Sequence, residues 1–211
     1  MDDLLKSLQE SIFQGQAEDA AKFTRQALEE KISAGEILEK GMIPAMDRIG
    51  EEFSKGMAYL PDLLVAARAM SAGMEILRGE LVKGGVEPKG KVLLGTVFGD
   101  VHDIGKNLVK MTLEGAGFQV IDLGTDVSAE KFAAAYKQHH PDLIGLSALL
   151  STTMNHMGEI IQKVREVNRS AKVIVGGAPI RQEFADKMGA NGFAPDAPMA
   201  VKKAKEILGI R

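Results

Sequence analysis

Apolar residues recur every three or four positions through the first 83 residues of the chain, a spacing that predicts amphipathic helices. Short breaks separate four such segments, and this pattern favours a small helical bundle. Pro44 lies inside the third segment, so we expect that helix to kink or to restart one turn later. The predicted helices span residues 2–13, 17–32, 36–56 and 60–81.

The periodicity changes after a break rich in glycine, GGVEPKG at residues 84–90, which we interpret as a linker between two domains. From Lys91 onward, short aliphatic runs alternate with helical stretches in five strand–helix units. Strands that are apolar on both faces are typical of a parallel sheet covered by helices. The predicted strands span residues 91–97, 119–124, 142–149, 172–177 and 192–196.

The expected fold class is therefore α/β. A four-helix bundle at residues 1–83 precedes a flavodoxin-like or Rossmann-like domain at residues 91–211, and the domain holds a five-stranded parallel sheet flanked by helices.

Composition narrows the class of protein. The net charge of −3 gives no basic footprint for nucleic acid, and no apolar run approaches the roughly 18 residues of a membrane helix. The absence of cysteine excludes disulfides, thiolate metal sites and cysteine nucleophiles, and it fits a reducing compartment. The first residues, MDDLLKSLQE, are acidic and unlike a signal peptide. We expect a cytoplasmic protein with no nucleic-acid or membrane partner.

Small and polar residues cluster after the predicted strands, where ligands bind in parallel α/β sheets. These segments are GDVHDIG at 99–105, GTDVSAE at 124–130, SALLSTTM at 147–154 and GGAPI at 176–180. We expect Gly176 and Gly177 to leave open space where side chains would normally stand. The first of the four segments lacks the G-x-G-x-x-G fingerprint of dinucleotide sites. It also has five residues rather than four between Gly99 and Gly105, so it is not a phosphate-binding loop of the Walker type.

His102 is the candidate with the clearest chemistry. A lone histidine near a helix start often only hydrogen-bonds its neighbours, but Asp100 can fix its tautomer and make the other ring nitrogen a better metal ligand. We interpret His139, His140 and His156 as residues of helix ends and surfaces. One histidine cannot hold zinc or iron, which need three or four protein ligands. A metal at His102 must therefore bring most of its ligands along, as a macrocyclic cofactor does.

At this point the chain resembles a known family. Its motifs match the D-x-H-x-x-G, S-x-L and G-G pattern of cobalamin-binding domains, in the same order along the chain. They are Asp100-x-His102-x-x-Gly105, Ser147-x-Leu149 and Gly176-Gly177. The stretch EEFSKGMAYLPDLLVAARAM, residues 51–70, is similar to the helical module that precedes this domain in methionine synthase and in corrinoid proteins of methyltransferase systems.

The resemblance implies that cobalamin or a related corrinoid is bound base-off/His-on, alternating between methylcob(III)alamin and cob(I)alamin. His102 would be the lower axial ligand of cobalt, and Asp100 would hydrogen-bond its far nitrogen. Thr153 has the spacing from Ser147 of a methionine synthase serine, which would complete a ligand-tuning relay of Asp100, His102 and Thr153. An ordinary helix N-cap is the alternative for Thr153. The remaining contacts expected for the cofactor and its nucleotide tail are Val101, Asp103, Ile104, Gly105, Ser147, Leu149, Ser151, Gly176 and Gly177.

The helical half would cover the upper face of the cofactor. Five of the 11 methionines lie between Met42 and Met74, and methionine makes an adaptable apolar surface. For any single methionine, plain bundle core is the alternative. Tyr59, Leu63 and Met70 are the candidates for contact near cobalt. The helical half must move aside to admit reactants, so we expect residues 84–90 to act as a hinge.

The function implied is that of a methyl carrier. One partner, a substrate:corrinoid methyltransferase, loads the cofactor. A methylcorrinoid:acceptor methyltransferase passes the methyl group to tetrahydrofolate or to a thiol such as coenzyme M, and a corrinoid reductive activase is a third partner. The two predicted domains leave no residues for a substrate-binding barrel, so the carrier is expected to be a non-catalytic subunit. The methyl donor (methanol, a methylamine, a methoxylated aromatic or betaine) is then chosen by the partner.

Other classes of protein fit the residues less well. A cobalamin-dependent regulator usually carries a DNA-binding head, and a radical mutase subunit rarely has the FSKGMAYLP module. A receiver-like domain would need an acidic phosphorylation pattern after the first strand, and it leaves the glycine pair unexplained.

Overall fold

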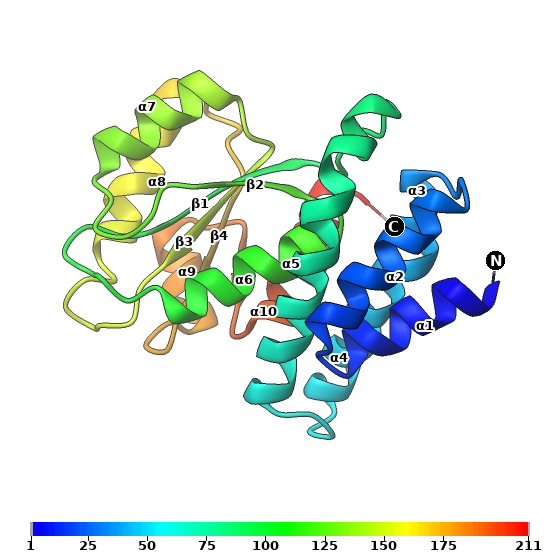
Figure 1. Ribbon diagram of the computed structural model, residues 1–211. Coiled ribbons are helices and arrows are strands. Elements are labelled where there is room, and N and C mark those ends of the chain that lie inside the picture. Colours follow the sequence, from blue (N-terminus) through cyan, green and yellow to red (C-terminus); the bar gives the residue numbers. More distant parts are fainter. Residues whose placement is uncertain (1, 211) are drawn as a thin grey trace. The chain divides into compact units, whose positions relative to one another are not determined.

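A computed structural model of the protein describes residues 2–210 (Figure 1). The chain folds into two compact units. The first comprises the chain as far as Pro88 together with Glu114–Gly117, and the second comprises Lys89–Leu113 and the chain from Phe118 onward. The roles of residues 84–90 as linker and hinge stay predictions. None of the helices in the described part of the chain has the length and apolarity needed to cross a membrane.

The first unit is helical, as predicted. Leu8, Ile12, Leu63 and Met70 are among its buried side chains. α2 packs against α1 and α5, and α4 packs against α1 and α5. The helices are α1 (Asp2–Phe13), α2 (Ala17–Glu29), α3 (Ala34–Glu36), the π-helical η1 (Ile37–Met42), α4 (Ile43–Ser54) and α5 (Leu60–Lys83).

The third predicted helix is interrupted just before Pro44, not one turn after it as expected. Ser33 caps its start by accepting a hydrogen bond from the Glu36 amide at 3.2 Å. The helix then widens into η1, and α4 begins at Ile43 with Pro44 in its first turn. Proline has no N–H to donate, so it is tolerated at a helix start but not in a helix interior.

The second unit is a five-stranded parallel sheet with strand order β2-β1-β3-β4-β5. Its helices alternate with the strands along the chain and cover both faces of the sheet (Figure 1). The strands are β1 (Lys91–Thr96), β2 (Gln119–Asp122), β3 (Leu143–Ser147), β4 (Val173–Gly176) and β5 (Gly192–Ala194). The helices are α6 (Ile104–Gly115), α7 (Ala129–His139), α8 (His156–Val167), α9 (Gln182–Met188) and α10 (Ala197–Leu208).

This strand order is the flavodoxin-like order, which confirms the predicted fold class. The order reverses between β1 and β3, and ligands of such sheets bind at the carboxyl ends of these two strands. Each strand is shorter than its predicted range. The third ends at Ser147, and α8 begins only at His156, three residues later than expected. The intervening residues 148–155 form a loop beside the β1–α6 loop.

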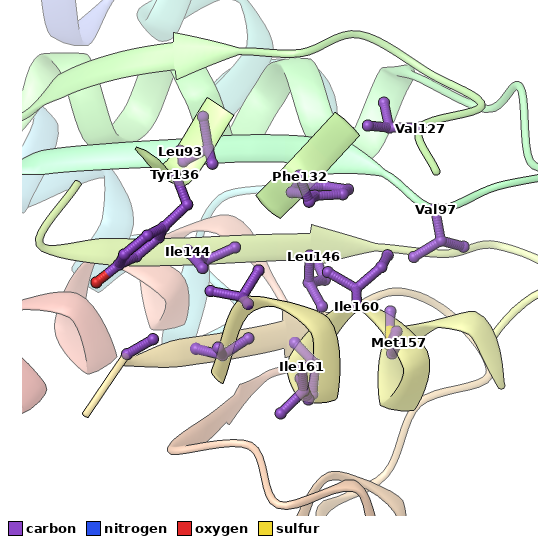
Figure 2. Close-up of a cluster of buried hydrophobic side chains, with 14 of the residues drawn as sticks. Leu93, Val97, Val127, Phe132, Tyr136, Ile144, Leu146, Met157, Ile160 and Ile161 are labelled. Atoms are coloured by element: carbon purple, nitrogen blue, oxygen red, sulfur yellow. The ribbon is translucent and has the colours of Figure 1, made fainter. Parts of the chain in front are cut away.

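The core of the second unit lies between the sheet and helices α7 and α8. Phe132 of α7 and Ile160 of α8 meet Ile144 of β3 in one buried cluster, shown in Figure 2. The Phe132 ring lies over Gly95 of β1, where a Cβ atom would stand 2.7 Å from the end of the ring. This packing explains why an aliphatic strand contains a glycine. The cluster holds the two strands that carry the site loops in one rigid layer.

Candidate functional site

The three motifs of the sequence meet at the carboxyl edge of the sheet. Thr96, the last residue of β1, pairs in register with Ser147, the last residue of β3, and Ser147 pairs with Gly176 of β4. The β1–α6 loop, which carries Asp100 and His102, begins at this edge. The edge is therefore the place where the strand order reverses and also the place where the predicted site residues gather.

Asp100 and His102 form a close hydrogen-bonded pair. Nδ1 of His102 lies 2.7 Å from Oδ1 of Asp100, and the His102 backbone N–H also donates to Oδ1 at 3.1 Å. A carboxylate can only accept, so the shared proton sits on Nδ1. Nε2 makes no hydrogen bond within residues 2–210, and the His102 side chain is 46% exposed. The ring therefore presents Nε2 to a ligand.

The other oxygen of Asp100 binds the β3–α8 loop. Oδ2 accepts hydrogen bonds from the Leu149 amide at 2.8 Å, the Leu150 amide at 3.2 Å and the Thr153 hydroxyl at 2.8 Å. Asp100 is fully buried. Burial by itself raises the pKa of Asp100, but hydrogen bonds from the Leu149 amide, the His102 ring and the Thr153 hydroxyl outweigh it. They hold the pKa well below its usual range. The carboxylate stays ionised beside the ring.

Thr153 is thus brought to Asp100 and His102. The alternative role of Thr153 as the N-cap of α8 is wrong, because the cap position is Asn155 and the Thr153 hydroxyl donates to Asp100 instead of accepting from the helix. A cap side chain must accept a hydrogen bond from the first turn. The geometry of the three residues matches the hydrogen-bonded chain that the sequence predicts.

The Thr153 hydroxyl is expected to contribute to stability. Thr153→Val keeps the shape of the side chain and removes the donor to Asp100, so we expect a loss of about 1–2 kcal/mol in the free energy of unfolding, measured with urea. Thr153→Ser keeps the hydroxyl and should lose less. Equal losses in the two variants would show that the methyl group and not the hydrogen bond matters there.

Exposed apolar side chains lie on the two loops that carry His102 and the donors to Asp100. Val101 is 72% exposed and Ile104 is 70% exposed. We call this set the apolar rim; it consists of Phe98, Val101, Ile104, Leu149 and Leu150. Exposed apolar side chains gathered at one place in this way mark a surface that a ligand or a partner covers. Phe98 and Leu150 were not among the residues chosen from the sequence.

The other predicted contacts have mixed surroundings. Ser147 is half-buried, and its hydroxyl makes no hydrogen bond within the described residues. Ser151 is exposed on the β3–α8 loop. Asp103 accepts from Asn107 in the first turn of α6 at 2.9 Å, which holds it on the helix start. A Cβ atom built on Gly105 meets nothing within 4 Å, so there is open space beside this turn.

Gly176 and Gly177 require a correction. The sequence suggested that they leave open space, but a Cβ on Gly176 would lie 2.7 Å from the carbonyl oxygen of Ala194. A Cβ on Gly177 would lie 1.8 Å from the carbonyl oxygen of Ala148, and Gly177 has a φ of 129°. The backbone of neighbouring segments fills these positions. Glycine is needed here for close backbone packing, whatever the cofactor does.

The three candidates in the helical unit differ in exposure. Leu63 and Met70 are fully buried, whereas Tyr59 is exposed just before α5. Of the three, only Tyr59 offers surface for a further contact. Their predicted contact with a cofactor stays a prediction.

The remaining histidines lie at surfaces or helix ends. His140 follows α7 as its C-cap with a φ of 48°. His156 is not merely a surface residue, because its ring packs edge-on against Phe98 with ring centres 5.6 Å apart. Its Nδ1 lies 2.9 Å from a carboxylate oxygen of Glu159. His156 therefore packs against one member of the apolar rim, Phe98.

Two further residues near the site, Lys106 and Thr96, could not be recognised as site residues from the sequence. The buried Lys106 binds both carboxylate oxygens of Asp122 at 2.8 and 2.7 Å, which ties the first turn of α6 to the end of β2. Thr96 donates its hydroxyl to the His102 carbonyl at 3.0 Å. Lys106 and Thr96 looked like ordinary helix and strand residues because their partners lie elsewhere in the chain.

Two family models match the chain. The model of a B12 binding domain matches residues 90–202, and a second model, also described as a B12 binding domain, matches residues 4–78. The fold, the site and these matches define the class of the protein: a B12-binding α/β domain preceded by a helical B12-binding region.

Individual relatives narrow this class. A corrinoid protein of Desulfitobacterium hafniense is 41% identical over 211 residues, which cover 98% of each chain. Dimethylamine corrinoid protein 2 of Methanosarcina acetivorans is 40% identical over 98% of this chain and 97% of its own. The methanol:cobalamin methyltransferase complex MtaBC of Methanosarcina barkeri contains a chain that matches with a TM-score of 0.86 and 29% identity, over 99% of this chain and 80% of that one. The chain belongs to the family of B12-binding corrinoid proteins, which confirms the predicted resemblance, and cobalamin or a related corrinoid is its cofactor.

Proposed function

We propose that this protein carries a methyl group on a corrinoid bound base-off/His-on, with Nε2 of His102 as the lower ligand of cobalt. The observation that carries the proposal is the pairing of Nδ1 with the buried Asp100 carboxylate at 2.7 Å while Nε2 is left without a partner among the described residues. Metal-binding histidines commonly donate their second ring nitrogen to a carboxylate in this way.

The residues around His102 fit a large flat cofactor. The apolar rim offers exposed apolar surface on the two loops at the site, and such surface suits the face of a macrocycle. The open space at Gly105 and the unpaired Ser147 hydroxyl are the features beside the ring that suit a nucleotide tail. Gly176 and Gly177 remain proposed neighbours of that tail through their backbone.

The corrinoid supplies a cobalt ion that accepts and releases a methyl group, and it is the chain's own residues that set the conditions. Asp100 holds a proton on Nδ1 and keeps a negative charge against the ring. Thr153 and the Leu149 amide keep that carboxylate ionised by donating to it. A ring held in this way is a stronger donor at Nε2 than a free imidazole. Breaking or loosening these hydrogen bonds weakens the ligand.

The names of the relatives support the proposed partners. One relative is a dimethylamine corrinoid protein, and one matching chain comes from a complex with a methanol:cobalamin methyltransferase. We extend this to the present chain as a carrier that serves a substrate:corrinoid methyltransferase whose donor is a methylated amine or an alcohol. An acceptor methyltransferase, acting on tetrahydrofolate or a thiol such as coenzyme M, and a reductive activase complete the proposed set. Tyr59 remains a proposed contact above the cobalt, and Leu63 and Met70, which are buried, remain proposed as part of a cover that moves aside.

The direct test is titration of the purified protein with hydroxocobalamin. We expect a stoichiometric complex whose absorption spectrum shows displacement of the dimethylbenzimidazole base. The base-off/His-on proposal would be contradicted if the cofactor kept its dimethylbenzimidazole on cobalt or if no stable complex formed. Methyl transfer should then require the added partner enzymes.

The apolar rim should be needed for binding. Val101→Glu places a charge where we propose the macrocycle to lie, so affinity for hydroxocobalamin should fall about tenfold, because a charged group is costly to bury. Val82→Glu is the matched control, since Val82 of α5 is 77% exposed and Val101 is 72% exposed. The control should bind as the wild type does. Equal affinities of the two variants would remove the rim from the proposed site.

A further inference from the structure

The backbone that leads to Asp100 makes a tight turn whose form is not set by its own sequence. Val97 to Asp100 form a β-turn in which the Asp100 amide donates to the Val97 carbonyl at 3.2 Å. Gly99, the third residue, has a φ of 76°, as type II turns require. Type I and type II turns differ in the orientation of the central peptide, here the one between Phe98 and Gly99. Glycine at position 99 permits either orientation.

Asp126, in the loop after β2, contacts this turn with both its side chain and its backbone. Its Oδ1 accepts a hydrogen bond from the Gly99 amide at 2.7 Å. Its own amide donates to the carbonyl of Asp100 at 2.9 Å. The first bond selects one orientation of the central peptide, and the second fixes the peptide that follows Asp100. Both bonds therefore act on the residue that holds the His102 ring.

Asp126 adopts an unusual conformation to make these contacts. Its φ is 53°, a left-handed value that costs energy for residues other than glycine, although aspartate tolerates it better than most. Strained residues that persist beside a site mark positions where the local geometry matters. The neighbouring Val127 anchors the loop, because its amide donates to the Thr96 carbonyl at 3.0 Å. Asp126 is thus presented to the turn from a fixed base.

We propose that Asp126 is a positioning residue for the cobalt ligand: it holds the turn that aims Asp100 at Nδ1 of His102, and so it sets which ring nitrogen is free. This role rests on the proposed function of His102. Asp126 and Gly99 are both exposed, so water can replace the lost partners when Asp126 is changed. Removing the Asp126 carboxylate should disturb the site far more than it disturbs stability.

The test compares Asp126→Gly with Asp126→Asn. The glycine variant keeps the left-handed backbone and loses the acceptor, whereas the asparagine variant keeps both an oxygen acceptor and tolerance of that conformation. His140→Gly is the matched control, because His140 is also left-handed, with a φ of 48°, but lies at the end of α7. Three properties are measured for each variant: the His102 tautomer in the cofactor-free protein by ¹⁵N NMR, hydroxocobalamin affinity, and Tm.

For Asp126→Gly we expect a measurable share of His102 with its proton on Nε2 and an affinity for hydroxocobalamin about tenfold lower, the size of effect seen for residues that orient metal ligands. Tm should match that of the wild type. Asp126→Asn and His140→Gly should keep the wild-type tautomer and affinity. A wild-type tautomer in Asp126→Gly would overturn the proposal.

Hydrogen exchange in the unmodified protein keeps the proposal testable even where a variant folds poorly. The Gly99 amide should exchange with solvent more slowly than other exposed loop amides, because Asp126 accepts its hydrogen bond. Unprotected exchange at Gly99 would overturn the proposal. The tautomer and exchange measurements need no cofactor, so failure of the Asp126 role is distinguishable from failure of the base-off/His-on proposal.

Discussion

His102→Gly is expected to abolish the histidine-ligated spectrum of the hydroxocobalamin complex and to weaken binding by about a hundredfold. The physical reason is that Nε2 of His102 is the nitrogen that Asp100 prepares for a metal, and loss of a ligand costs at least as much as loss of its supporting hydrogen bonds. Absorption spectra and equilibrium dialysis of the complex are the measurements.

Rescue makes this result specific. The His102 side chain is 46% exposed, so free imidazole can reach the place it leaves, and added imidazole should restore a nitrogen-ligated spectrum in the glycine variant. His139→Gly is the control for histidine loss, because His139 ends α7 at a distance along the chain from both site loops. If His102→Gly keeps the wild-type spectrum without imidazole, another group ligates the cobalt.

Asp100→Asn should lower the free energy of unfolding by about 3 kcal/mol at pH 7, the largest stability effect that we expect at the site. The buried carboxylate accepts hydrogen bonds from three backbone amides, the Thr153 hydroxyl and the His102 ring. An amide cannot accept all of these, and buried donors without an acceptor are costly. Urea denaturation gives the number. Asp142→Asn is the control: Asp142 accepts from the Lys91 amide but is exposed, so its loss should cost less than about 1 kcal/mol.

The difference in stability between the wild type and Asp100→Asn is expected to depend on pH. The pKa of Asp100 is lowered in the folded state relative to about 3.9 in an unfolded chain. A carboxyl group with a lowered pKa stabilises the fold above its unfolded value, and this stabilisation is lost as the pH falls towards the folded value. The advantage of the wild type over Asp100→Asn should therefore be full at pH 7 and shrink below about pH 4. An advantage that stays constant down to pH 3 would contradict the proposed charge on Asp100.

Local patterns were sufficient to predict the elements and the residues that lie in motifs. The alternation of aliphatic runs with helices predicted the parallel sheet and the gathering of the strand ends at one edge, where the structure pairs Ser147 with Gly176. Asp100 and His102 are two residues apart, so the sequence spacing alone allows their side chains to pair. Pro44 predicted a break in its helix because proline cannot donate a backbone hydrogen bond.

Other parts of the site depend on contacts between segments distant in sequence, and these had no local signal. Asp126 lies on the loop after β2, and nothing in GTDVSAE reveals that its carboxylate meets the Gly99 amide. Gly177 was predicted to leave space, but the carbonyl of Ala148, from the β3–α8 loop, fills that position. Phe98 and Leu150 carry no polar group that would mark them as site residues, and only the fold shows that their side chains are exposed. Tertiary packing decides each of these cases.

The β3–α8 loop gives the site a two-way connection to its surroundings. Leu149 and Leu150 each expose an apolar side chain in the rim while their backbone amides donate to Asp100. A displacement of those two side chains would therefore move the backbone amides that donate to the carboxylate holding His102. Thermodynamic coupling is reciprocal, so a change in how strongly the imidazole is held must alter, by the same free energy, which arrangement of the two leucines is favoured. A partner that contacts Leu149 and Leu150 would in this way bind differently according to how strongly His102 is held.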